Sequence, residues 1–286
     1  MQFVTANGAT IPALGFGTYG MPRSDMLHMI PAALKAGFRH FDTAQIYRNE
    51  AEVGECVAAS GLKRKDIFLT TKVWVANYPD RAFATSVDQS LRKLRTDYID
   101  LLLLHWPSDT TPLVEQIASL DAAVKAGKVR HIGVSNFNRT LMAEAVKLST
   151  TPIVTNQFEY HPYLNQAPLI EECRRLNVSV TAYCGMAVGR VFEDSVLQEI
   201  AKAHGKNVAQ VVLRWLLQQG VIALSRTVST ERLIGNIQVF DFALTSIEIA
   251  TIHGLAEADA RIVNPPGLSP QWDSTPVTER CGASGS

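Results

Sequence analysis

The sequence predicts a (β/α)8 barrel, a closed ring of eight parallel strands surrounded by helices. Eight short β-type runs alternate with helical patterns along most of the 286 residues, as is typical of this fold. Most of the runs are continuously apolar, which is expected of strands buried on both faces. A doubly wound open sheet is the main alternative. The first strand, however, contains "GFGTYG" at 15–20, whose glycines lack the spacing of a dinucleotide-binding loop.

The predicted strands follow one another at regular intervals. Ahead of the first, Asn7 and Gly8 separate two short β-like runs, which predicts a hairpin with a tight turn. The eight barrel strands are expected at 13–18, 38–43, 67–73, 99–105, 130–135, 153–159, 178–183 and 221–224.

Helical spacing of apolar residues predicts the segments between the strands. Ser24 is expected to cap the first helix, and Pro31 inside it indicates a kink. Thr245 and Glu248 have the spacing of a capping box for the last helix. The expected helices cover 24–36, 80–94, 113–126, 138–149, 167–176 and 195–203, followed by a strongly apolar helix that starts at Asn207.

Composition argues against several classes of protein. Lys+Arg and Asp+Glu both number 27 and the pI is about 7.1, so no surface for nucleic acid or an anionic membrane is expected. No apolar run is long enough for a transmembrane helix, and the N-terminus lacks the pattern of a signal peptide. The four cysteines form no CxxC pair, which favours reduced thiols in a cytoplasmic protein. We expect one domain over 1–273 and a small, polar, disordered tail over 274–286.

Four reactive side chains lie at or just after predicted strand ends. Asp42 closes the second strand and Tyr47 follows five residues later, while Lys72 and His105 come at the ends of the third and fourth strands. Alone, each has an ordinary explanation: a turn cap, a loop aromatic, a solvated strand end and a core histidine. In a β/α barrel, however, all these ends lie on one face, where chemistry takes place.

Together these groups could donate a proton to a carbonyl without a metal. A free phenol has a pKa near 10, and a buried ammonium such as that of Lys72 is expected to lower it. The Asp42 carboxylate would keep Lys72 charged and in position. A neutral imidazole at His105 could orient the oxygen of the substrate, so the four groups make a proton donor, Tyr47, beside a small oxyanion site.

The segments that carry these residues resemble the aldo-keto reductases. The resemblance extends from about residue 10 to 273 and is strongest in "GFRHFDTAQIYRNEAEVG", "TTKVW", "DYIDLLLLHWP", "GVSNF" and "NQFEYHPY". Within the family, the ending "ARIVNPPGLSPQWD" at 260–273 is similar to the bacterial group of 2,5-diketo-D-gluconic acid and methylglyoxal reductases.

The resemblance implies a role for each of the four residues. Tyr47 would be the general acid, tuned by Lys72 and Asp42, and His105 would orient the carbonyl that receives the hydride. Relatives that reduce C=C bonds have Glu in place of this histidine, so His105 favours carbonyl reduction.

The resemblance also implies NADPH bound in an extended form without a Rossmann fold. Tyr183 would stack on the nicotinamide, although a packed core aromatic is the alternative reading. Arg226 and Arg232 would flank the 2′-phosphate, since guanidinium is a good bidentate phosphate partner; two exposed arginines without a ligand are the alternative. Ser229 is expected to cap the short helix that holds Arg232. The remaining cofactor residues would be Ser135, Asn136 and Gln157 at the nicotinamide carboxamide, and Thr227 and Asn236 at the adenosine phosphate.

The chain departs from the family pattern in two places. Gly235 replaces a commonly acidic residue near the adenine, and Cys184 replaces a serine near the pyrophosphate. The segment "CGMAVGR" at 184–190 predicts a flexible or re-shaped strap, because it contains Gly185 and Gly189.

Aromatic residues after three strands are expected to form the substrate pocket. Tyr19, Trp74 and Trp106 follow strands one, three and four, although ordinary loop packing would also explain them. The C-terminal loop is expected to cover the active-site face, with Trp272 reaching inward.

The sequence thus indicates a monomeric, NADPH-dependent enzyme that reduces small aldehydes and ketones, including ketoaldehydes and sugar-derived ketoacids. A barrel that binds NADPH without turnover, as a sensing or partner subunit, is the first alternative. A metal-dependent barrel hydrolase is the second, and it would need a convergent ligand set. His161 after the sixth strand and His105 make a poor one, so no metal is expected.

Overall fold

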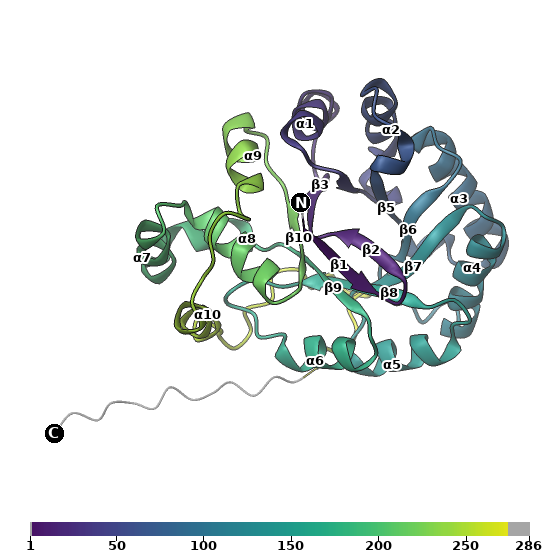
Figure 1. The fold of residues 1–286 in the computed structure, drawn as a ribbon. Helices are drawn as coiled ribbons and strands as arrows, with labels where there is room; N and C mark the ends of the chain where they lie inside the picture. The colour runs from purple at the N-terminus through teal and green to yellow at the C-terminus, as the bar shows by residue number, and fades with distance from the viewer. Residues whose placement is uncertain (1, 274–286) are drawn as a thin grey trace.

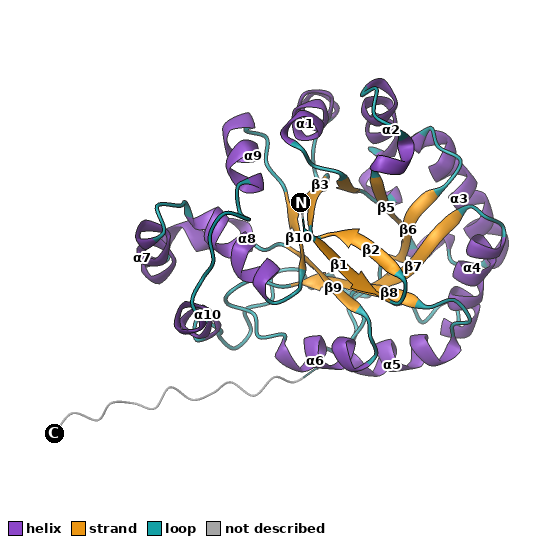
Figure 2. Ribbon diagram, viewed as in Figure 1, coloured by secondary structure: helices purple, strands orange, loops and turns teal. Residues whose placement is uncertain are grey.

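The computed structural model of the protein describes residues 2–273 and contains the predicted closed barrel (Figures 1 and 2). Its eight strands are all parallel and follow the order β10-β3-β4-β5-β6-β7-β8-β9, with β9 pairing back to β10. Every predicted barrel strand is present, with ends that differ by at most two residues from the expected ranges. The strands are β3 (Leu14–Gly17), β4 (His40–Asp42), β5 (Phe68–Val73), β6 (Ile99–Leu104), β7 (Val129–Ser135), β8 (Ile153–Glu159), β9 (Ser179–Tyr183) and β10 (Ile222–Ser225).

Helices surround the barrel on its outer side (Figure 2). The predicted capping box at Thr245 and Glu248 is present, and a second one joins Asn207 and Gln210. The helices are α1 (Arg23–Ala36), α2 (Glu50–Ala59), α3 (Asp80–Leu94), α4 (Leu113–Lys125), α5 (Arg139–Leu148), α6 (Ala167–Arg175), α7 (Ser195–Ala203), α8 (Val208–Gln218), α9 (Thr230–Ile237) and α10 (Ser246–His253).

Two helix expectations were wrong or incomplete. Ser24 does not cap α1, because the helix already begins at Arg23 and follows Pro22, which has no side-chain cap; the helix continues through Pro31. The helix α2 was not predicted, although it carries acidic residues in its first turn. It also contains Gly54, where a Cβ atom would lie 2.3 Å from the carbonyl oxygen of Lys93. Glycine therefore permits close packing of α2 on α3 while it weakens the helical sequence pattern.

The predicted hairpin closes the amino-terminal end of the barrel. Strands β1 (Phe3–Ala6) and β2 (Ala9–Pro12) pair antiparallel across Asn7 and Gly8, whose φ angles are 46° and 84°. Positive φ at both turn positions matches the twist of a tight hairpin. Figure 1 shows the hairpin lying across the barrel. Its residues Ala9 and Ile11 pack in one cluster with Leu101, Leu103, Val154 and Ile222 from the barrel strands.

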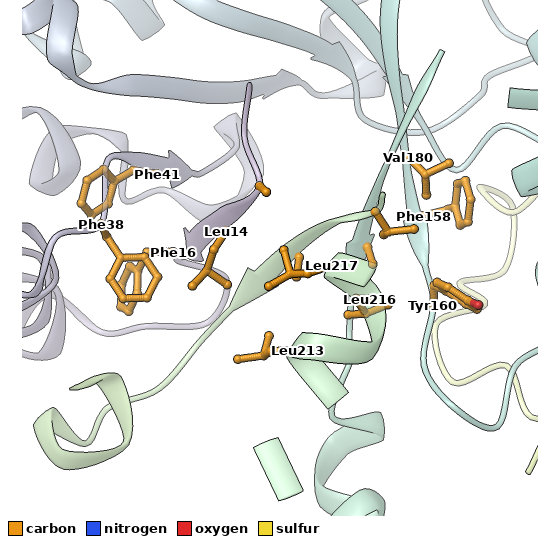
Figure 3. Packing of buried hydrophobic residues seen from close by; sticks show 14 of the residues in the cluster. Leu14, Phe16, Phe38, Phe41, Phe158, Tyr160, Val180, Leu213, Leu216 and Leu217 are labelled. Carbon is orange, nitrogen blue, oxygen red and sulfur yellow. The ribbon is translucent and has the colours of Figure 1, made fainter. Parts of the chain in front are cut away.

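A continuous apolar core lies between the barrel and its helices. Figure 3 shows Leu213, Leu216 and Leu217 of α8 between the region of Leu14 and that of Phe158 and Val180. This packing fixes the strands, so their carboxyl ends form a rigid frame for the loops that follow. The expected division of the chain at residue 273 stays a prediction, and the tail at 274–286 falls outside the described residues.

No helix within residues 2–273 has the length and apolar character needed to cross a membrane.

Candidate active site

The four predicted reactive residues gather at the carboxyl ends of β4, β5 and β6. Asp42 is the last residue of β4, Lys72 is the next-to-last residue of β5, and His105 directly follows β6. Tyr47 ends a short 3-10 helix, Gln45–Tyr47, in the loop after β4. Because these strands are neighbours in the closed sheet, their ends present all four side chains on one face.

Lys72 and Asp42 form a buried ion pair. The Lys72 Nζ atom lies 2.5 Å from Oδ1 of Asp42 and donates a second hydrogen bond of 2.9 Å to the carbonyl oxygen of Thr43. The Lys72 and Asp42 side chains are only 1% and 4% exposed. Gln157 Nε2 donates to the other Asp42 oxygen at 2.8 Å. The carboxylate is therefore held from two sides, and the ammonium is fixed in the buried interior of the protein.

Tyr47 lies between this ion pair and His105. The Lys72 Nζ atom is 5.0 Å from the centroid of the Tyr47 ring, and the His105 ring centroid is 5.5 Å from it at an interplanar angle of 77°. Tyr19 packs edge-to-face on Tyr47 at 5.1 Å. The phenol is thus held by three neighbours.

Burial sets the proton states of this group. It holds the pKa of His105 well below its usual value, and the nearby Lys72 ammonium lowers it further, so the imidazole is neutral near pH 7. Burial also lowers the pKa of Lys72, while the Asp42 carboxylate opposes this shift. The expected lowering of the Tyr47 pKa is wrong for this structure. Burial is the main cause and raises that pKa well above its usual value, and the Asp42 charge adds to the effect.

Gln45 joins the Tyr47 loop to the loop after β5. Its Oε1 atom accepts hydrogen bonds from the Trp74 backbone N–H at 3.0 Å and from Asn77 Nδ2 at 2.9 Å. Its Nε2 atom donates to Ser86 on α3 at 3.0 Å. A role for Gln45 could not be predicted from the sequence, because its partners lie about 30 or more residues away along the chain.

The expected nicotinamide residues form a hydrogen-bonded network at the ends of β7, β8 and β9. Ser135 Oγ donates to the Gln157 carbonyl at 2.8 Å, and Asn136 Nδ2 donates to the His105 carbonyl at 3.0 Å. The Tyr183 hydroxyl donates to Asn136 Oδ1 at 2.7 Å. The Tyr183 ring is therefore held in orientation, and the amides are already paired with one another, so a bound carboxamide would share or replace these bonds.

The expected phosphate residues lie in the segment before α9 and within α9 itself. Arg226 and Arg232 are exposed, and Ser229 caps α9 as predicted by accepting from the Arg232 backbone N–H at 3.3 Å. Arg226 Nε donates to the Tyr19 carbonyl at 2.6 Å. Thr227 is buried, and Asn236 Nδ2 donates to Ser225 Oγ at 2.9 Å. Arg232 thus lies in the first turn of α9, while the Arg226 guanidinium is bound to the loop after β3.

The unusual segment at 184–190 has a twisted backbone. Cys184 has a φ of 58° and Gly189 has a φ of 99°. Val188, a β-branched residue, also has a positive φ, 52°, and its side chain is 80% exposed. Arg190 then pairs with Glu257 at 2.7 Å. Cys184 and Gly189 thus lie in a segment with several positive φ angles, which an ion pair joins to Glu257.

Two of the expected pocket aromatics contact Tyr47 and His105, and the other two contact each other. Besides Tyr19, Trp74 packs edge-to-face on His105 at 5.4 Å, and Trp106 packs on Trp272 at 6.5 Å. The C-terminal loop that carries Trp272 is bound to the barrel, since Asn138 Nδ2 donates to the Gln271 carbonyl at 2.9 Å. This loop covers the carboxyl face, as predicted.

Glu159 and Arg261 form part of this face, and neither was predicted from the sequence. Glu159, the fully buried last residue of β8, accepts the backbone N–H groups of Ile262 and Val263 at 2.8 Å each. Arg261 stacks on Trp272 with its guanidinium carbon 3.6 Å from the ring centroid. One feature of the sequence could have indicated a role for Glu159. It is a charged residue at the end of an apolar strand, inside the segment "NQFEYHPY".

Within residues 2–273, no cluster of three or more His, Cys, Asp or Glu side chains is arranged to hold a metal ion.

Together, the closed barrel and the ion-paired lysine beside a tyrosine and a histidine form the arrangement that the resemblance of the sequence motifs implied. The sequence matches the aldo/keto reductase family over residues 13–257. The chain therefore belongs to the aldo/keto reductase family, as the resemblance of its motifs implied.

Individual relatives agree with this assignment. The chain is 37% identical over 267 residues to methylglyoxal reductase DkgB of Salmonella typhi, covering 92% of this chain and all of the relative. The crystal structure of a proposed 2,5-diketo-D-gluconic acid reductase B superposes with a TM-score of 0.95 at 58% identity, covering 96% of this chain and 98% of that one. A Bombyx mori aldo-keto reductase, solved in complex with NADP, has a TM-score of 0.84 at 33% identity, with 90% and 94% covered.

Proposed function

We propose that the protein uses NADPH to reduce small aldehydes and ketones to alcohols, with Tyr47 as the proton donor. Ketoaldehydes and sugar-derived ketoacids are the proposed substrates. The observation that carries the proposal is the position of Tyr47, between the buried Lys72–Asp42 ion pair and a neutral His105. The names of the relatives, a methylglyoxal reductase and a diketogluconic acid reductase, support the substrate class.

NADPH, when bound, supplies the hydride that reduces the carbonyl carbon. The residues present fit this cofactor. Tyr183 offers a ring held by its hydrogen bond to Asn136. Arg232 in the first turn of α9 and Arg226, four residues before that helix, offer two exposed cations. A helix N-terminus with nearby guanidinium groups favours a phosphate. The extra phosphate of NADPH would use these cations, and the NADP complex of the Bombyx mori relative agrees with this choice.

The proton step belongs to Tyr47. Its raised pKa keeps the phenol protonated at neutral pH, so the proton is present when the substrate binds. Negative charge that develops on the carbonyl oxygen during reduction makes that oxygen a strong acceptor for it. The Lys72 ammonium lies 5.0 Å from the Tyr47 ring centroid, where it would stabilise the phenolate left behind.

His105 orients the carbonyl in this proposal. A neutral imidazole has one N–H donor, which can hold the substrate oxygen beside the Tyr47 hydroxyl. Because His105 stays neutral, it does not compete with Tyr47 as an acid near pH 7. Its Nδ1 atom is buried and has no hydrogen-bond partner among the described residues.

Aromatic side chains would select the substrate by size. Tyr19, Trp74 and Trp106 form an apolar wall around His105 and Tyr47, and Trp272 on the C-terminal loop adds to it. Such a wall excludes water and accepts the carbon skeleton of a small carbonyl compound.

A panel of carbonyl substrates tests the proposal through the loss of nicotinamide absorbance. We expect the purified protein to oxidise NADPH in the presence of methylglyoxal or a sugar-derived ketoacid, and to do so unchanged in the presence of a chelator. Tight NADPH binding without turnover of any substrate in the panel would instead support the non-catalytic, sensing role.

A further inference from the structure

Arg261 carries a guanidinium group whose hydrogen-bonding capacity is unused. Its side chain is only 13% exposed, yet it donates no hydrogen bond to another residue of the described part of the chain, and its Nη1 atom is buried without a partner. A guanidinium has five N–H donors and strongly disfavours burial without acceptors. The described part of the protein therefore provides no hydrogen-bond acceptor for this guanidinium group.

Arg64 shows how this protein normally accommodates an arginine at similar depth. The Arg64 side chain is 22% exposed, and it donates to Thr96 Oγ1, to the carbonyl oxygens of Ile67 and Tyr98, and to Asp100 at 2.6 Å. Arg261 has less exposure and none of these bonds. Its environment is thus unlike that of a structural arginine in the same fold.

The carboxylate nearest to Arg261 does not fill this role. Arg261 Nη1 lies 4.0 Å from Oε2 of Glu159, beyond hydrogen-bond distance. The Glu159 oxygens already accept from the backbone N–H groups of Ile262 and Val263 and lie 3.0 Å from Nε2 of His161. Glu159 offsets part of the Arg261 charge and fixes the loop that carries it, but it leaves the donors free.

The position of Arg261 points to the substrate pocket. Its guanidinium stacks on the face of Trp272, which packs on Trp106, the residue after His105. On the other side, Glu159 pairs in register with Tyr183 across β8 and β9. The nearby acid Asp273 is itself paired with Arg139, at 3.3 Å. Arg261 is therefore a cation with free donors beside the pocket aromatics.

We infer that Arg261 binds a carboxylate group of the substrate, so that the enzyme prefers carbonyl compounds which carry a carboxylate away from the reacting carbonyl. Arginine recognises carboxylates through two parallel N–H···O bonds. The stacked Trp272 ring holds the guanidinium plane, which reduces the conformational entropy lost when the ligand binds. This inference rests on the proposed carbonyl reduction and makes its substrate class more specific.

Matched substrates test the inference. Two carboxylated aldehydes, succinic semialdehyde and 4-carboxybenzaldehyde, are each compared with their methyl ester, so that charge changes while the aldehyde stays the same. Steady-state kinetics are measured for the wild type, for Arg261→Met, for Arg261→Lys, and for a control, Arg175→Met. Arg175 is exposed and paired with Glu172 on α6, so it serves as an arginine whose donors are already used. Thermal unfolding and the KM for NADPH are measured for each variant.

We expect the wild type to prefer at least one acid over its ester, mainly through KM. Arg261→Met should reduce that preference about tenfold or more, as loss of a charge-assisted hydrogen bond implies. Arg261→Lys should retain part of the preference, and Arg175→Met all of it. If Arg261→Met lowers kcat/KM equally for acid and ester, or if it raises the KM for NADPH and leaves the acid-to-ester ratio unchanged, the inference is wrong. A wild type that reduces both esters but prefers neither acid would also overturn it, whereas failure to reduce any of the four compounds would count against the proposed function itself.

Discussion

The buried Lys72–Asp42 pair predicts opposite pH effects for two single substitutions. Asp42→Asn leaves Lys72 without its carboxylate, and Lys72→Met leaves Asp42 without its ammonium. Because both side chains are almost fully buried, the remaining partner is expected to become neutral rather than stay charged alone.

The free energy needed to neutralise the remaining partner sets how much each variant loses in unfolding free energy. An unpaired Lys72 that loses its proton at pH 7 destabilises the fold by up to about 4.6 kcal/mol, from a reference pKa near 10.4 and about 1.36 kcal/mol per pKa unit. An unpaired Asp42 that gains a proton at pH 7 costs up to about 4.2 kcal/mol, from a reference pKa near 3.9. Asp42→Asn/Lys72→Met contains neither ion, so its cost should be well below the sum of the two single costs.

The signs of the two pH dependences differ. In Asp42→Asn the unfolded chain binds the lysine proton that the native state lacks, so the cost should fall to about 1.9 kcal/mol at pH 9. In Lys72→Met the native state holds the aspartic proton, so the cost should fall to about 1.5 kcal/mol at pH 5. Urea unfolding followed by tryptophan fluorescence measures each cost as a difference from the wild type at the same pH.

Two results would refute this reasoning. One is that both single variants change in the same direction with pH. The other is that their costs add in the double variant, which would mean that the pair is not coupled.

Two further predictions follow from the same site. Arg226→Ala combined with Arg232→Ala should raise the KM for NADPH about tenfold or more, as expected for lost charge-assisted contacts, and should change the KM for NADH much less; equal changes would remove the phosphate assignment. The buried, neutral His105 should destabilise the fold as pH decreases, because its pKa is depressed in the folded state and the unfolded chain takes up a proton below a pKa near 6.5. Between pH 7 and 5.5 the wild type should therefore lose about 1 kcal/mol more unfolding free energy than His105→Asn, and an equal loss in both proteins would show that His105 is not the buried neutral group described.

The strand pattern was readable from the sequence because it depends on local composition. A continuous apolar run such as that of β6 indicates a strand buried on both faces. The positions where such runs end identified Asp42, Lys72 and His105 as candidate site residues. The helix α2 was missed because Gly54 serves a contact with α3 that the local pattern does not reveal.

Contacts between distant segments could not be predicted in the same way. Glu159 binds backbone groups more than 100 positions later in the chain, and Arg261 stacks on a tryptophan in a loop without regular structure. Such pairs exist only after the barrel has closed and the end of the chain has returned across its face. The direction of the Tyr47 pKa shift was mispredicted for a related reason, since its main cause is burial, which arises only in the folded barrel.

Tyr47→Phe tests the central claim most directly, because it removes the phenolic hydroxyl and changes little else in volume. NADPH binding is measured by cofactor fluorescence, and hydride transfer by single-turnover loss of nicotinamide absorbance with methylglyoxal. The account predicts nearly unchanged NADPH affinity and a rate reduced at least about 100-fold, the scale of general acid catalysis. A variant that keeps more than about a tenth of the wild-type rate would show that the proton comes from another group.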